Sequence, residues 1–165
     1  MIFGQGKIYL PDDTQPEIFD PVMNTWSNWT RPSTPMCYAC FVSWKNYIFQ
    51  FGGPSPAYSR QVQKYDPSTH KWTTLSTSPF DIYRSGCVTL PRGTILFVGS
   101  MGYYEYNVTE NVWSKTCPGC SYQNPNVPTL LVFGFRVLII PSPAVEVPAK
   151  WFSDIPGGCI GVKKL

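Results

Sequence analysis

The sequence predicts an all-β protein built from a repeated unit, and three observations support this. An aromatic residue followed by Asp or Asn, with a Trp seven positions after the aromatic, occurs three times: Phe19-Asp20 with Trp26, Tyr65-Asp66 with Trp72, and Tyr106-Asn107 with Trp113. The Trp residues lie 46 and then 41 positions apart, a period typical of repeat architectures. Short apolar runs alternate with turn residues, without sustained helical spacing. The 17 prolines and 13 glycines are spread along the chain, as many short strands and tight turns require.

The expected strands keep their register from one repeat to the next. The segments 48–51 and 94–98 are rich in β-branched and aromatic residues and are followed or bounded by glycine, so each predicts a strand. A shift of 47 positions lays Ile48 on Ile95, Gly52 on Gly99 and Cys40 on Cys87. Asp66-Pro67 favours a turn, which predicts a hairpin between the strand ending at Tyr65 and the strand starting at Trp72.

These residues resemble a known family. Gly52-Gly53 after an apolar strand, then Tyr65-Asp66-Pro67 and Trp72, is similar to the kelch repeat. The resemblance implies that each repeat forms one four-stranded blade of a β-propeller. The implied domain is one partial propeller over 1–165, with repeats at about 1–32, 33–79, 80–116 and 117–152, and with 153–165 as the start of a further strand or a tail.

The repeats differ in how completely they carry the motif. The second has both glycines, the third keeps Gly99 with Ser100 after it, and the first has neither. The fourth keeps an apolar strand at 137–140 and Trp151 but lacks the aromatic-Asp pair. Propellers close with about four to eight blades. The sequence therefore predicts an incomplete arc of three to four blades, and a chain that is a fragment of a longer product.

Composition argues against several classes of protein. The net charge is +3, and the basic residues are scattered rather than gathered on one face, so nucleic acid is not an expected partner. The longest apolar run, Leu130 to Ile140, is interrupted by Gly134 and Arg136 and is too short to span a membrane.

The cysteines form two C-x-x-C pairs, Cys37 with Cys40 and Cys117 with Cys120. The 76 residues between the pairs exceed the spacing of a zinc ribbon, so no metal site is predicted. A disulfide between Cys117 and Cys120 is the favoured interpretation if the compartment is oxidising. Cys40 and Cys87, at one position of their repeats, are interpreted as small buried hydrophobes on the innermost strand.

Two N-glycosylation sequons begin at Asn28 and Asn107, and both are expected on exposed turns. With six cysteines they favour an extracellular or secretory location, with a cytoplasmic location as the alternative. Asn107 has a second interpretation that needs no glycan, because it fills the turn-starting position that Asp20 and Asp66 fill elsewhere.

The sequence favours a protein-binding scaffold over an enzyme. His70 is the single histidine and lies in an expected turn without metal-ligating neighbours, so no catalytic site and no cofactor is predicted. The kelch resemblance implies binding of an unidentified protein through inter-strand loops on one rim. The candidate loops are 54–61, with Tyr58 and Arg60, and 77–84. The alternative is the non-catalytic arc of a propeller enzyme, either copper oxidase-like or carbohydrate-active.

Overall fold

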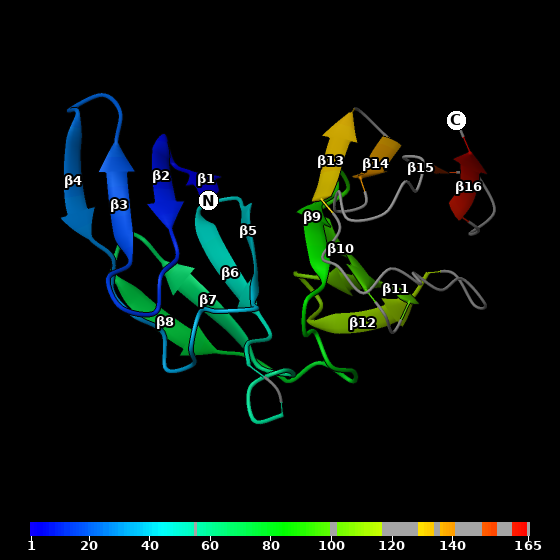
Figure 1. Cartoon of the computed structure of the whole chain (residues 1–165), viewed down its shortest axis with the longest axis horizontal. Coiled ribbons are helices and arrows are strands. Elements are labelled where there is room, and N and C mark those ends of the chain that lie inside the picture. The colour runs from blue at the N-terminus through cyan, green and yellow to red at the C-terminus, as the bar shows by residue number, and fades with distance from the viewer. Residues whose placement is uncertain are drawn as a thin grey trace. The chain divides into compact units, whose positions relative to one another are not determined.

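The fold was analysed in a computed structural model, which describes residues 1–54, 56–99, 102–116, 129–133, 136–140, 150–154 and 160–164. The described residues form strands, turns and loops without a helix, which confirms the all-β prediction. The sixteen strands make four antiparallel four-stranded sheets, each a simple meander in chain order (Figure 1). The chain divides into two compact units, Met1–Tyr83 and Arg84–Leu165.

The first compact unit contains two sheets. Sheet 1 consists of β1 (Ile2–Gly4), β2 (Lys7–Leu10), β3 (Glu17–Asp20) and β4 (Thr25–Asn28). Sheet 2 consists of β5 (Cys40–Trp44), β6 (Tyr47–Phe51), β7 (Val62–Asp66) and β8 (Lys71–Thr74). The first strands of the two sheets, β1 and β5, contact each other.

The second compact unit has the same organisation. Sheet 3 consists of β9 (Gly86–Thr89), β10 (Thr94–Gly99), β11 (Gly102–Asn107) and β12 (Val112–Lys115). Sheet 4 consists of β13 (Thr129–Phe133), β14 (Arg136–Ile140), β15 (Lys150–Asp154) and β16 (Ile160–Lys164). Its first strand, β13, contacts β9. Sheet 4 thus continues to Lys164, beyond the expected end of the fourth repeat at 152.

The seven-residue spacing from aromatic to Trp has a direct structural cause. In the last hairpin of sheets 1, 2 and 3 the aromatic and the Trp lie opposite each other on neighbouring strands: Phe19 with Trp26, Tyr65 with Trp72, and Tyr106 with Trp113. Their ring centroids are 4.8, 5.1 and 4.7 Å apart. Cross-strand aromatic pairs of this kind stabilise a sheet. The predicted hairpin is confirmed.

The turns of these hairpins repeat one set of hydrogen bonds. Asp20 Oδ1 accepts from the N–H of Val22 and Met23, and Asn107 Oδ1 accepts from the N–H of Thr109 and Glu110. The residue before each closing strand has a positive φ of 52 to 56°, at Asn24, His70 and Asn111. In the second and third turns that residue also accepts or shares a hydrogen bond with the Tyr hydroxyl of the aromatic position.

Asp66 makes the second turn sensitive to acid. Its Oδ1 accepts from the hydroxyl and the N–H of Ser68, and these bonds hold the pKa of Asp66 below its usual value. A lowered folded-state pKa gives stability that is present above about pH 4 and is lost as the pH falls toward the folded-state pKa. Asp66→Asn keeps the acceptor, as Asn107 does naturally, and removes the titration. We expect the free energy of unfolding to fall less steeply between about pH 5 and 2 in Asp66→Asn than in the wild type. The free energy of unfolding is measured by denaturant titration at each pH. An equal pH dependence in the wild type and in Asp66→Asn would contradict this prediction.

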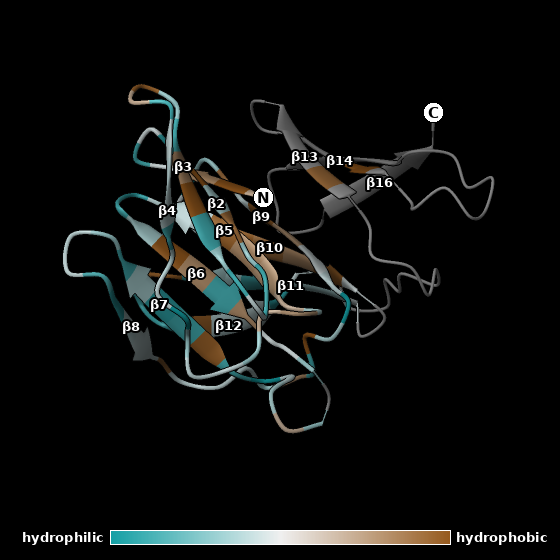
Figure 2. Ribbon diagram, turned by 60° about the vertical axis from the view of Figure 1, so that its left-hand side comes forward, coloured by the Kyte–Doolittle hydropathy of each residue, from teal (hydrophilic) through white to brown (hydrophobic). Residues whose placement is uncertain are grey.

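Each compact unit contains a cluster of buried apolar side chains. Figure 2 colours the hydrophobic residues of the described strands brown. The core of the first unit joins both sheets through the segment that connects them, which contributes Trp29 and Met36. Its other buried members are Ile2, Tyr9, Ile18, Ile48 and Tyr65. The core of the second unit contains Leu90, Leu96, Val98, Tyr103 and Ile139.

Two predictions about single residues were wrong. Cys40 and Cys87 are half-buried and disulfide-bonded, rather than small buried hydrophobes, because the position of a cysteine in a repeat does not reveal whether its thiol is oxidised. Asn28 and Asn107 were both expected on exposed turns, but they lie at the ends of β4 and β11, where strand pairing continues to Glu17 and Val112 opposite them. Asn28 is exposed as expected, whereas Asn107 is half-buried. Cys117 and Cys120 lie outside the described residues.

Candidate functional site

A groove of about 440 Å³ lies at one end of sheets 1 and 2. In an antiparallel meander the loop between the second and third strands and the segment leaving the fourth strand share one end. The loop after β2, the segment between β4 and β5, and the loop after β6 therefore meet there, opposite the β3–β4 hairpin (Figure 1). They line the groove with Asp12, Asp13, Arg31, Pro32, Ser33, Thr34, Pro35, Met36 and Tyr58, which we call the rim groove.

Two carboxylates fix the backbone of one wall. Asp13 accepts from the N–H of Met36 at 2.5 Å and of Cys37 at 3.2 Å, which ties the loop after β2 to the segment between the sheets. Asp12 accepts from the N–H groups of Thr14 and Gln15 at 2.7 and 2.9 Å. The Thr14 hydroxyl and these N–H groups lower the pKa of Asp12 to about 2. Asp12 therefore stays ionised at neutral pH.

A buried polar network fixes the floor. The hydroxyl of Thr34 accepts hydrogen bonds from the side-chain amides of Gln50 and Gln63, which face each other on β6 and β7. Gln50 also donates to the carbonyl of Pro35 at 2.8 Å, and Gln63 accepts from the N–H of Ser33 at 3.3 Å. All three side chains of the network are buried. Gln50 Oε1 is buried without a hydrogen-bond partner, so the network is not fully satisfied. Its remaining bonds still tie the segment 33–35 to β6 and β7.

The loop after β6 carries both candidate binding residues, but only one lines the groove. Tyr58 is 37% exposed, and its N–H donates to the carbonyl of Pro54 at 3.1 Å. Gly53 lets it pack closely, because a Cβ there would lie 3.1 Å from the Tyr58 Cβ. Arg60 points elsewhere, since its Nε donates to Asp81 Oδ1 at 3.0 Å in an exposed ion pair. The structure thus assigns the two residues different surroundings.

Sequence reasoning missed Arg31. This side chain is exposed, lines the rim groove, and forms no salt bridge within the described part of the chain. Arg31 lies on a segment between two repeats, where the repeat pattern assigns no role to any residue. The sequence offered one signal that could have indicated Arg31 as a groove residue, which is its position beside Pro32 in a segment that crosses between sheets.

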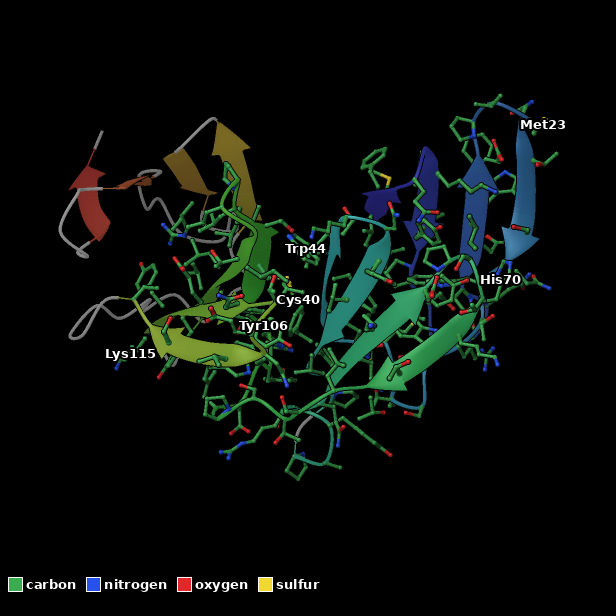
Figure 3. All side chains as sticks on the ribbon, turned by 180° about the vertical axis from the view of Figure 1, so that it is seen from behind. Met23, Cys40, Trp44, His70, Tyr106 and Lys115 are labelled. Atoms are coloured by element: carbon green, nitrogen blue, oxygen red, sulfur yellow. The ribbon has the colours of Figure 1, made fainter. Side chains whose placement is uncertain are left out.

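His70 and Met23 lie away from the rim groove. His70 lies at the tip of the β7–β8 hairpin and Met23 at the tip of the β3–β4 hairpin (Figure 3). Over the described ranges no group of three or more His, Cys, Asp or Glu side chains is placed to hold a metal ion. The described residues also include no helix with the length and apolarity to cross a membrane.

Comparisons with known proteins agree with this architecture. Residues 35–79, which contain sheet 2, match the family model described as the kelch motif. The protein tag-53 of Caenorhabditis elegans is 27% identical over 95 residues, which are 57% of this chain and 7% of that protein. The solved structure of YjhT superposes with a TM-score of 0.78 at 15% identity, covering 99% of this chain and 63% of YjhT. The chain thus spans a small part of tag-53 and under two thirds of YjhT.

The four-stranded meanders with their hairpin aromatic pairs define the class as blades of a β-propeller. Residues 35–79 carry a kelch motif, within a fold that resembles a kelch-type β-propeller.

Proposed function

We propose that this chain is a non-enzymatic scaffold that binds a protein partner at the rim groove. The observation that carries the proposal is that Tyr58, from the loop after β6, and Arg31, from the segment that joins sheets 1 and 2, line one groove. Tyr and Arg are the residue types that most often dominate binding energy at protein interfaces. The groove volume of about 440 Å³ suits one anchoring side chain or a short peptide segment.

Rigidity of the walls supports the same function. Asp13 and the network around Thr34 hold the backbone before any partner arrives. A pre-organised surface loses little conformational entropy on binding, so more of the contact energy appears as affinity.

Replacing the anchoring side chains tests the proposal. The full chain is first used as bait to capture a partner, and the affinity for the purified partner is then measured. We expect Tyr58→Ala or Arg31→Ala to raise the Kd about tenfold or more. Arg60→Ala is expected to have a smaller effect, because its guanidinium is paired with Asp81. Met23→Ala, on the opposite rim, is the control.

Unchanged affinity in both Tyr58→Ala and Arg31→Ala would show that the partner binds elsewhere. Metal analysis of the full-length product distinguishes the enzyme alternative, since stoichiometric copper would favour an oxidase of which this chain is the non-catalytic part.

A further inference from the structure

The two sequons have unequal surroundings. Asn28 is exposed at the end of β4, and its side chain makes no hydrogen bond within the described part of the chain. Asn107 is half-buried, and its Oδ1 accepts from the N–H of Thr109 at 3.0 Å and of Glu110 at 3.2 Å. Asn28 is therefore the more exposed of the two acceptor side chains, and the one that takes no part in a turn.

A second groove, of about 380 Å³, adjoins Asn28. It is lined by Thr14, Gln15, Pro16, Asn28, Trp29 and Arg31. Arg31 also lines the rim groove, so the two grooves share a wall. A substituent on Asn28 therefore starts inside a surface depression that ends at the proposed partner-binding residue.

The cysteines indicate a compartment in which such a substituent is added. Cys40 and Cys87 are disulfide-bonded, and stable disulfides are characteristic of secreted proteins and of the oxidising lumen of the secretory pathway. Asn-x-Ser/Thr acceptors are glycosylated in that same compartment. The disulfide-bonded cysteines and the sequon are independent features that point to one location.

We propose that Asn28 carries an N-linked glycan that lies over the groove between Asn28 and Arg31. In the transfer, the Asn28 Nδ2 forms a bond to C1 of the first sugar of a lipid pyrophosphate-linked oligosaccharide. The bond between C1 and the pyrophosphate oxygen breaks, the lipid pyrophosphate leaves, and the amide releases one proton. No oxidant or reductant is needed.

The structure also sets the time of transfer. Trp29, the middle residue of the sequon, is 3% exposed and packs against Tyr9 and Trp72 at centroid distances of 5.1 and 5.6 Å. The carbonyl of Thr30 accepts from the Trp72 indole N–H at 2.7 Å. In the folded chain this tripeptide cannot enter an enzyme active site, so glycosylation precedes the docking of sheets 1 and 2.

Mass spectrometry of the full chain made in a eukaryotic secretory host tests occupancy. Asn28→Gln is expected to remove the mass of one glycan in both the cell-retained and the secreted protein, so a folding defect does not obscure the result. Asn107→Gln is the matched control and is expected to leave the Asn28 peptide glycosylated. A wild type and an Asn28→Gln variant with equal glycan content would overturn the proposal.

The position of the glycan is tested by the reactivity of Arg31 toward phenylglyoxal, measured peptide by peptide. Arg31 is expected to react severalfold more slowly in the glycosylated wild type than in Asn28→Gln, while the rate at Arg60 stays constant. Equal Arg31 rates would overturn the placement over the groove. Any effect of the glycan on partner binding rests on the proposed function. The glycan mass and the Arg31 reaction rate are both measured without a partner, so the glycan proposal and the binding proposal can fail separately.

Discussion

Replacing Gly52 by alanine is expected to lower the free energy of unfolding by about 2–5 kcal/mol. Gly52 has a φ of +75°, and a Cβ at this position would lie 2.5 Å from the backbone carbonyl oxygen of Ile82. A backbone atom cannot move aside as a flexible side chain can, and Ile82 is itself buried and bonded through its N–H to the carbonyl of Ser59. The variant has to distort one of the two segments.

Gly6 provides the matched control for this effect. Its φ is +73°, but a Cβ there would meet nothing within 4 Å. Gly6→Ala therefore carries the same backbone strain without the clash, and is expected to cost about 1–2 kcal/mol. The free energies of unfolding of Gly52→Ala and Gly6→Ala, measured by denaturant titration, separate the cost of backbone strain from the cost of the clash with the Ile82 carbonyl. Equal losses would show that the Ile82 carbonyl does not determine the need for glycine.

Trp72→Ala is expected to destabilise the chain by about 3 kcal/mol, and Trp26→Ala by about 0.2–1 kcal/mol. The two Trp residues occupy one position of the repeat but differ in surroundings. Trp72 packs on Trp29 and donates its indole N–H to the carbonyl of Thr30, so it joins sheet 2 to the segment leaving sheet 1. Trp26 is 56% exposed and packs mainly on Phe19.

The comparison is made by thermal and denaturant unfolding of both variants and of Trp72→Phe. Trp72→Phe keeps a ring but loses the hydrogen bond, so it is expected to fall between the wild type and Trp72→Ala. If Trp26→Ala were as destabilising as Trp72→Ala, the stability would come from the hairpin pair alone. The contact between the sheets would then contribute little.

The fold could be predicted because its determinants are local. Cross-strand partners such as Tyr65 and Trp72 lie in one hairpin, so the distance between them in sequence is fixed by the turn. The turn chemistry of Asp66 and Asn107 is local for the same reason. The sequence also showed a glycine at the start of the loop after β6. It did not show why glycine is needed there, which is the close approach of the Ile82 backbone to Gly52.

The candidate site depended on contacts between distant residues, and most of it could not be predicted. Asp13 reaches Met36 across 23 positions and Gln63 reaches Thr34 across 29, and no pattern in the sequence marks these pairs. Tyr58 was found because its loop is longer than the corresponding loop of the third repeat. Arg31 was not found, because the segments between repeats vary and carry no motif.

Site-specific photo-crosslinking tests the rim groove most directly. A benzophenone amino acid is placed at Tyr58 in one sample and at Met23, on the opposite rim, in another, and each full-length chain is irradiated with the partner present. We expect covalent capture of the partner from position 58 and not from position 23. Capture from position 23 alone would place the interface on the opposite rim and contradict binding at the groove.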